Sequence, residues 1–253
     1  MNWDSVDFAI LGPAILAGLL VTSTHVPLGR VVLQRGIIFI DLAIAQIAGL
    51  GIIAAATFGW DLNGWAVQIA AVSAALLGAA LLNVTERFFP ESQEAIIGVS
   101  FVLAATLGIL LLANNPHGGE HLKELLVGQI LWVDYEQLLP VAALYGVLLA
   151  FWHYWAHSQH NRLWFYFTFA LTVTASVQLV GVYLVFATLI IPPLSTRKLE
   201  GQRRMLIAYT IAGLGYILGL ILSALFNLPS GAVIVWTLFL VGLVTAFVLP
   251  NNK

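Results

Sequence analysis

The sequence predicts an all-α, multi-pass membrane protein, and three properties of the 253-residue chain lead to that prediction. Hydrophobic residues make up 60% of the chain and charged residues only 9%, against roughly 45–50% and about 25% in soluble domains. The mean hydropathy is +0.96. The apolar residues gather into windows close to the ~20 residues that one helical crossing of a bilayer needs. A surface with so little charge suits lipid, so we expect a single transmembrane domain over residues 1–253.

Seven windows are continuous apolar runs that are long enough, or nearly long enough, to cross a bilayer. In chain order they are residues 8–24, 37–58, 66–82, 95–113, 138–152, 206–226 and 232–249. The connections between them carry turn-forming residues such as Asn114, Asn115 and Pro116, and none is long enough to hold a separate domain. We therefore expect seven separate crossings, with His25 at the interface where the first one closes.

The eighth apolar stretch, residues 163–194, is too long for one crossing. As a single helix of about 32 residues it would extend about 48 Å, against a hydrocarbon core about 30 Å thick. Arg162 precedes it and Arg197 and Lys198 follow it, and such residues favour the cytoplasmic side. We expect a broken hairpin that reverses near Gln178 and Gly181, with legs of about 14 residues lined by protein. The total is then eight to nine membrane segments.

The basic residues predict the orientation of the chain. If the N-terminus lies outside and each segment reverses direction, nine of the ten Lys and Arg residues fall on the cytoplasmic side, all except Lys123. Such a bias is the usual orientation signal of membrane proteins. We therefore expect an external N-terminus and a cytoplasmic C-terminus. The acids left outside would attract cations, although sorting of the basic residues alone produces the same pattern.

Several function classes are excluded by what the sequence lacks. A net charge of −2 carries no basic excess for nucleic-acid binding, and zero cysteines exclude thiolate metal sites. No G-x-x-x-x-G-K-[ST] phosphate loop, H-E-x-x-H zinc site or G-x-S-x-G nucleophile motif occurs. We expect neither enzymatic activity nor nucleotide hydrolysis in this chain, which leaves transport or a membrane scaffold.

Five stretches of the sequence carry a resemblance to one family, in that family's order. They are LGRVVLQRG (28–36), ESQEAIIGVSF (91–101), LLVGQILWV (125–133), VQLVGVYLVFATLIIPPLSTRKLEG (177–201) and NLPSGAVIV (227–235). In these stretches the chain resembles the permease subunits of the zinc and manganese ABC importers. The resemblance touches most of the chain.

That resemblance implies an assembly. A permease of this family is a homodimer, binds a cytoplasmic ABC ATPase on each subunit, and receives its ion from an external or periplasmic metal-binding protein. The chain would then lie in a bacterial inner or plasma membrane and hold no permanent cofactor. It would import a divalent transition metal, for which zinc is the first expectation, and the ATP would be hydrolysed on the partner subunit. An ATP-independent carrier or channel for a cation or small polar solute is the alternative. A repeated pair of broken helices would favour a carrier, and only one hairpin is visible.

The resemblance also implies a role for residues 192–204. Pro192 and Pro193 are expected to end the returning leg, because proline removes a helix donor, and Ser195 to cap a short helix through Arg204. In the family this segment is the cytoplasmic coupling helix, which sits in a cleft of the ATPase. Its basic residues are Arg197, Lys198, Arg203 and Arg204. From charge alone they are equally well explained as interfacial anchors.

Asp41 is the one acid inside an apolar window and the first candidate for the translocation path. An intramembrane carboxylate is costly and marks a functional site by default; the alternative is a structural partner for Arg35 or for a polar group of a neighbouring helix. In the family a similarly placed carboxylate is followed four residues later by a histidine, but here that residue is Ala45. Gln46 restores the match if a π-bulge absorbs one residue, or it is an interhelical hydrogen-bonder. Gln178, at the expected reversal, is the third candidate.

His117, Glu120 and His121 form a second candidate group. They lie on the predicted external connection before the fifth window, where imidazole and carboxylate groups could make a transient metal contact. Gly118 and Gly119 are expected to break the helix that would align the two histidines. A solvated loop is the alternative explanation.

Overall fold

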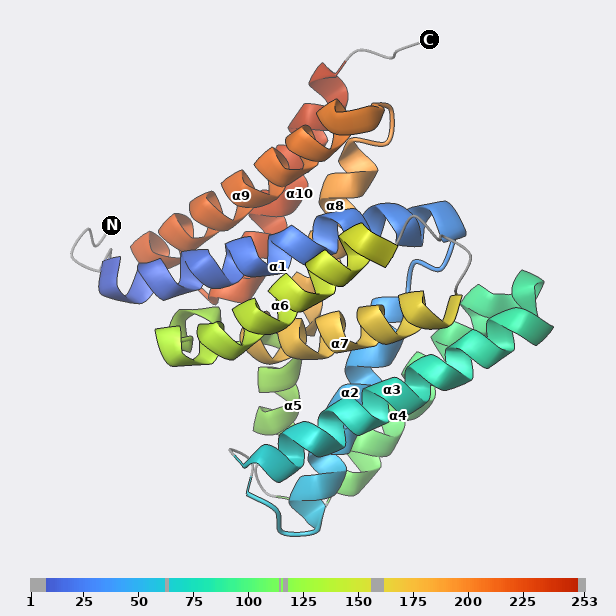
Figure 1. The fold of residues 1–253 in the computed structure, drawn as a ribbon. Helices are drawn as coiled ribbons and strands as arrows, with labels where there is room; N and C mark the ends of the chain where they lie inside the picture. The colour runs from blue at the N-terminus through green and yellow to red at the C-terminus, as the bar shows by residue number, and fades with distance from the viewer. Residues whose placement is uncertain (1–7, 62–63, 114, 116–117, 156–161, 250–253) are drawn as a thin grey trace. The chain divides into compact units, whose positions relative to one another are not determined.

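The computed structural model describes residues 8–61, 64–113, 115, 118–155 and 162–249, and every regular element in these residues is helical (Figure 1). The α-helices are α1 (Phe8–Arg35), α2 (Ile40–Thr57), α3 (Trp65–Phe88), α4 (Gln93–Leu112), α5 (Gly118–Val127), α6 (Tyr135–Trp155), α7 (Arg162–Val180), α8 (Val182–Ser195), α9 (Gly201–Phe226) and α10 (Ser230–Val248). Two short 3₁₀ helices, η2 (Pro90–Ser92) and η3 (Ile130–Trp132), lie between them. The predicted all-α class is confirmed.

In the described part of the chain, 8 helices are long and apolar enough to cross a membrane. They are α1, α2, α3, α4 with the preceding η2, α6, α7, α9 and α10, and α8 is a shorter apolar helix. Many large apolar side chains on them are exposed, among them Ile69, Leu77 and Leu103. A helix that turns such side chains outward is suited to lipid. The predicted total of eight to nine membrane segments therefore agrees with the structure.

The break predicted in the long apolar stretch falls at Gly181, between α7 and α8. Gly181 has φ 81° and ψ 162°, a conformation that is open essentially only to glycine. The expectation of two legs of about 14 residues was wrong for the first leg, because α7 has 19 residues and α8 has 14. Gln178 lies inside α7, so the helix continues past it and stops only where the backbone of Gly181 leaves the helical region.

Helix α1 extends further than the sequence predicted. It runs for 28 residues to Arg35 and holds Pro27 in its interior, whereas the apolar window ends at residue 24. Its last part packs closely on α8: a Cβ on Gly29 would overlap the backbone carbonyl of Leu189. The expectation that His25 lies at an interface is wrong, because His25 is 0% exposed inside this helix.

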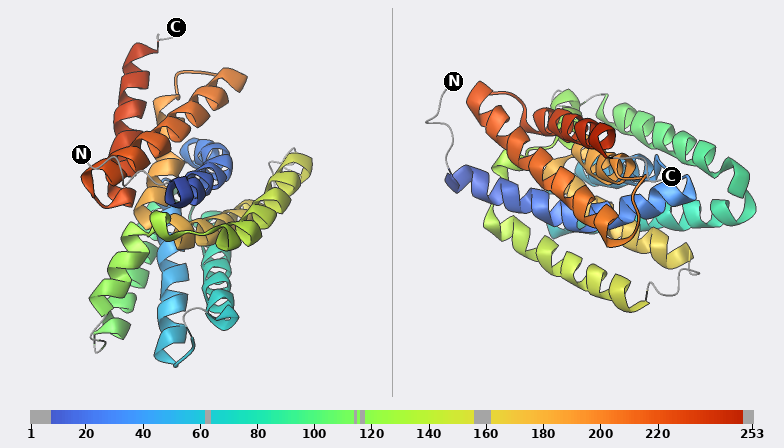
Figure 2. Two further views of the ribbon diagram at one scale, coloured as in Figure 1. Left: turned by 90° about the vertical axis from the view of Figure 1, so that its left-hand side faces the viewer. Right: turned by 90° about the horizontal axis from the view of Figure 1, so that it is seen from above.

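The chain forms two compact units, and each unit is built from segments that are not adjacent in the sequence. Unit 1 contains residues 1–35, 126–147 and 179–253. In it, α8 packs against α1, α9 and α10 (Figures 1 and 2). Its side chains are accordingly buried over most of its length. This short helix is the centre of unit 1.

Unit 2 contains residues 36–125 and 148–178, and its centre is α2, which packs against α3 and α4 (Figures 1 and 2). Small residues allow the close approach: a Cβ on Gly51 would lie 2.8 Å from the Ala70 carbonyl oxygen of α3. The start of α4 is held by the buried amide of Gln93, whose Nε2 donates to the Leu82 carbonyl at 2.8 Å and to the Tyr166 hydroxyl at 3.0 Å. These contacts fix the position of the residue that follows, Glu94.

Candidate functional site

Asp41 lies in the first turn of α2 and is 1% exposed. The backbone N–H groups of Asp41 and Leu42 lie near its carboxylate, as is favourable at a helix N-terminus, but neither is placed to donate a hydrogen bond to it. Both carboxylate oxygens are without a partner among the described residues. The structural alternative was a partner for Arg35 or for a polar group of a neighbouring helix, and the described residues supply neither as a hydrogen-bond partner of Asp41. A buried carboxylate with no donor is able to accept a cation.

A second acid, which the sequence did not single out, is held close to the start of the same helix. The backbone N–H of Phe39, the residue before α2, donates to Glu94 Oε1 at 3.2 Å. The other oxygen, Oε2, is buried and has no hydrogen-bond partner within the part of the chain that the structure describes. The carboxylates of Glu94 and Asp41 interact electrostatically as like charges. Because Glu94 lies on α4, 53 positions along the chain from Asp41, only packing brings the two acids together.

The structure does not contain the bulge expected between Asp41 and Gln46. Helix α2 is a continuous α-helix from Ile40 to Thr57. At 3.6 residues per turn, a spacing of five residues turns the side chain by about 140°, so the two side chains do not share a face. Gln46 is half-buried, and the position one turn after Asp41 is the buried Ala45. Gln178, in the last turn of α7, is exposed.

The group of His117, Glu120 and His121 lies largely outside the described residues. His117 is not described, nor is the side chain of His121; Glu120 is exposed in the first turn of α5. The expectation that Gly118 and Gly119 break the helix was wrong, since α5 begins at Gly118. Within the described residues, no three His, Asp or Glu side chains gather closely enough to hold a metal ion.

The expected coupling segment has a different local structure from the one predicted. Pro192 and Pro193 lie inside α8, and the helix ends two residues later, at Ser195. Ser195 is therefore not an N-cap; its Oγ donates back to the Ile191 carbonyl at 2.9 Å. A turn follows, and the next helix, α9, begins at Gly201 with Glu200 before it.

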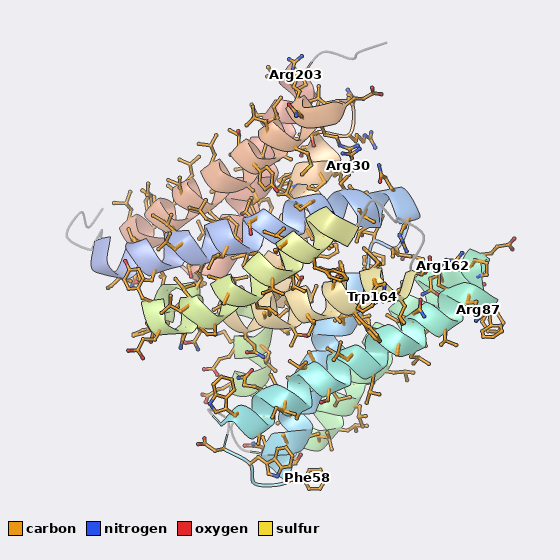
Figure 3. All side chains as sticks on the ribbon, in the orientation of Figure 1. Arg30, Phe58, Arg87, Arg162, Trp164 and Arg203 are labelled. Carbon is orange, nitrogen blue, oxygen red and sulfur yellow. The ribbon has the colours of Figure 1, made fainter. Side chains whose placement is uncertain are left out.

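The basic residues of this segment differ in their surroundings. Arg197 and Lys198 are exposed in the turn, and Arg203 is exposed in the first turn of α9. Arg204 is half-buried and its Nη2 donates to the Pro193 carbonyl at 3.4 Å, which ties α9 to the end of α8. In unit 1, Arg203 lies at the same end as Arg30 of α1 (Figure 3). In unit 2, Arg87 and Arg162 lie at one end of the helices and Phe58 lies at the other (Figure 3).

Three glycines of unit 1 bring the break after α7, the end of α5 and the start of α10 together. Gly128 follows α5 with φ 71°, and a Cβ there would lie 2.5 Å from the Gly181 nitrogen. A Cβ on Gly181 would lie 2.6 Å from the Gly128 Cα. A Cβ on Gly231 of α10 would overlap the Val127 carbonyl. Gly128 and Gly181 belong to two of the five stretches that carry the family resemblance, 125–133 and 177–201. These two stretches therefore meet in one packed junction.

A polar group on α1 was also missed by the sequence reasoning. His25 Nδ1 lies 2.9 Å from the Val21 carbonyl and 3.1 Å from Thr24 Oγ1. His25 Nε2 and Thr22 Oγ1 are buried and have no hydrogen-bond partner among the residues that the structure describes. On α8 and α9, Thr188 Oγ1 and the Tyr216 hydroxyl lie 2.9 Å apart. A sequence offers little signal for such contacts, because Thr, His and Tyr are also ordinary residues of membrane interfaces.

The eight helices long and apolar enough to cross a membrane in the described part of the chain define a multi-pass membrane protein. The ABC 3 transport family matches residues 7–159 and 156–249. The chain belongs to this family, which confirms the resemblance to the permeases of metal-ion ABC importers. It is a transport permease subunit for metal ions.

Individual relatives and a solved structure agree with that assignment. The chain is 24% identical over 249 residues to the high-affinity zinc uptake system membrane protein ZnuB of Buchnera aphidicola, with 90% of this chain and 93% of that protein covered. It is 24% identical over 254 residues to ZnuB of Haemophilus influenzae, covering 92% and 95%. PsaBC from Streptococcus pneumoniae, solved in complex with Fab, has a chain of the same fold, with a TM-score of 0.78, 20% identity, and 100% and 98% coverage.

Proposed function

We propose that this chain is the permease subunit of an ABC importer that moves a divalent transition metal ion, zinc first, into the cell. The observation that carries the proposal is the carboxylate of Asp41, which is buried in a metal-ion permease and has no hydrogen-bond partner among the described residues. Such a group is expensive in a membrane unless it serves the substrate. Zinc is supported by the two relatives that are named for zinc uptake.

The same proposal includes the partners. Two copies of the chain form the path, an ABC ATPase binds each copy on the cytoplasmic side, and an external metal-binding protein delivers the ion. Residues 192–204 contact the ATPase through the exposed Arg197, Lys198 and Arg203. Pro192 and Pro193 contribute as the buried end of α8, and Ser195 and Arg204 by fixing the turn between α8 and α9. Closure of the ATPase would then act on α8, at the centre of unit 1.

The proposed orientation keeps the N-terminus outside and the C-terminus in the cytoplasm of a bacterial cell. The residues proposed to face the path are Asp41, Gln46 and Gln178. On the external side, Glu120, with His117 and His121, gives the arriving ion a weak first contact. The clustering of basic side chains at one end within each unit supports this orientation (Figure 3).

Two measurements test the function. A tagged permease expressed from its own operon should co-purify with an ABC ATPase, which an ATP-independent carrier or channel would not do. Cells lacking the chain should contain less zinc in zinc-poor medium and recover when the gene is restored. Normal contents of zinc, manganese and iron in such cells would reject metal import, and a selective loss of manganese would replace zinc as the substrate.

A further inference from the structure

We infer that Glu94 of α4 and Asp41 of α2 together form an oxygen-donor site for a divalent cation, with Glu94 and not Gln46 as the second ligand. This inference rests on the proposed function, since the cation would be the transported metal. It assigns a role to Glu94, which the sequence motifs did not suggest.

Three carboxylate oxygens of Asp41 and Glu94 are unsatisfied. Asp41 Oδ1, Asp41 Oδ2 and Glu94 Oε2 are all buried, and no hydrogen-bond donor in the described part of the chain reaches them. Buried polar atoms are nearly always partnered, and two carboxylates that repel each other at one place make the lack of a partner costlier. A divalent cation removes both problems, because it coordinates the free oxygens and its attraction to each carboxylate outweighs their mutual repulsion.

The two acids are also held in place by their surroundings. Glu94 Oε1 accepts from the Phe39 N–H at 3.2 Å, and Phe39 lies two residues before Asp41. The preceding residue, Gln93, is fixed by the Leu82 carbonyl and the Tyr166 hydroxyl, and its Oε1 accepts from Thr85 Oγ1 at 3.0 Å. One oxygen of Glu94 thus anchors the loop before α2, and the other, Oε2, has no hydrogen-bond partner among the described residues. This division suits a ligand whose position must be kept when the ion leaves.

The alternative second ligand, Gln46, is disfavoured by the geometry of α2. In a continuous α-helix Gln46 points about 140° away from Asp41, and the residue one turn on is Ala45, which has no ligand atom. Carboxylate is therefore the only donor type of the two-residue site, which lacks the imidazole that zinc and other borderline metals prefer. Such a site accepts Mn²⁺ as well as Zn²⁺ and holds either loosely. The metal is then selected in the step that delivers the ion to the permease.

The site can be tested by metal binding to the purified permease–ATPase complex in detergent without ATP. ⁶⁵Zn²⁺ binding and the electron paramagnetic resonance signal of Mn²⁺ would be measured for the wild type, Asp41→Asn and Glu94→Gln. Glu94→Gln keeps an oxygen that can accept from Phe39 N–H, so it removes the charge and leaves the anchor. Glu91→Gln, an exposed acid three residues earlier, is the matched control. Glu94→Asp restores the charge and serves if Glu94→Gln does not fold.

We expect Asp41→Asn and Glu94→Gln each to weaken binding of both metals at least tenfold, and Glu91→Gln to change it less than twofold. Glu94→Asp should bind more tightly than Glu94→Gln. Wild-type affinity in Glu94→Gln, or no metal bound by the wild-type complex, would overturn the two-carboxylate site. ATP-driven uptake by the same variants, reconstituted into proteoliposomes, separates the two proposals. Uptake by Glu94→Gln at the wild-type rate rejects the site and leaves the function, whereas no uptake by the wild type rejects the function.

Discussion

Replacing Gly128 by alanine should destabilise the protein more than the same change at a glycine that has only a positive φ or only a close neighbour. Gly128 has φ 71°, which costs a residue with a Cβ about 1–2 kcal/mol. The new Cβ would also lie 2.5 Å from the backbone nitrogen of Gly181, and forcing an atom into such packing typically costs about 1–3 kcal/mol. Backbone atoms cannot rotate away as a flexible side chain does. The expected loss is therefore about 2–5 kcal/mol.

Three further glycines separate the two contributions. Gly36 follows α1 with φ 70°, and no atom of the described residues lies within 4 Å of its Cβ position, so Gly36→Ala should lose only about 1–2 kcal/mol. Gly231 has an overlap with Val127 but no positive φ, so Gly231→Ala should lose about 1–3 kcal/mol. Gly213 lies in α9 with open space around it, and Gly213→Ala should be neutral or stabilising by up to about 1 kcal/mol.

Thermal unfolding of the detergent-solubilised protein, followed by the fluorescence of its 8 tryptophans, measures these losses. One kcal/mol corresponds to about 2–4 °C for a chain of this size, so Gly128→Ala should lower the melting temperature by at least about 4 °C. Its shift should exceed that of Gly36→Ala. Equal shifts for these two variants would show that the Gly128 backbone does not approach Gly181, and would refute the packed junction.

Two other predictions concern coupling and the metal. Arg203→Glu should lower several-fold the stimulation of ATP hydrolysis by the loaded binding protein while leaving the complex folded. Lys123→Glu, an equal charge reversal on the predicted opposite side of the membrane, should not lower it. Normal stimulation in Arg203→Glu would show that other residues couple the permease to the ATPase. Ala45→His should tighten zinc binding in equilibrium dialysis, because position 45 lies one helical turn from Asp41. Gln46→His should tighten zinc binding less. The reverse order would support a bulge in α2 and contradict the continuous helix.

Much of the fold could be predicted from the sequence, because hydropathy over a window of ~20 residues measures directly what a bilayer requires. The break at Gly181 followed from length, since no single helix of residues 163–194 fits the membrane. The end of α1 could not be predicted in this way. Hydropathy falls after residue 24 and Pro27 opposes a helix, but packing against α8 at Gly29 offsets these local preferences.

The candidate site was only half predictable. A carboxylate in an apolar window singles out Asp41 without any structure, whereas Glu94 stands among charged residues at the start of a window and gives no such signal. Ser195 illustrates the converse error: a serine after two prolines resembles the start of a helix, but its hydroxyl bonds back to Ile191 at the end of one. Both outcomes depend on which neighbour the fold supplies, and local sequence does not contain that information.

The central claim, that this permease carries a divalent metal past Asp41, is tested most directly by metal uptake into proteoliposomes. The vesicles would contain the permease with its ATPase, ATP at the nucleotide-binding face and zinc-loaded binding protein at the other. Wild-type vesicles should accumulate ⁶⁵Zn²⁺ only with ATP, and Asp41→Asn vesicles with the same protein content should lose most of that uptake. Uptake by Asp41→Asn at the wild-type rate over a range of zinc concentrations would contradict the claim.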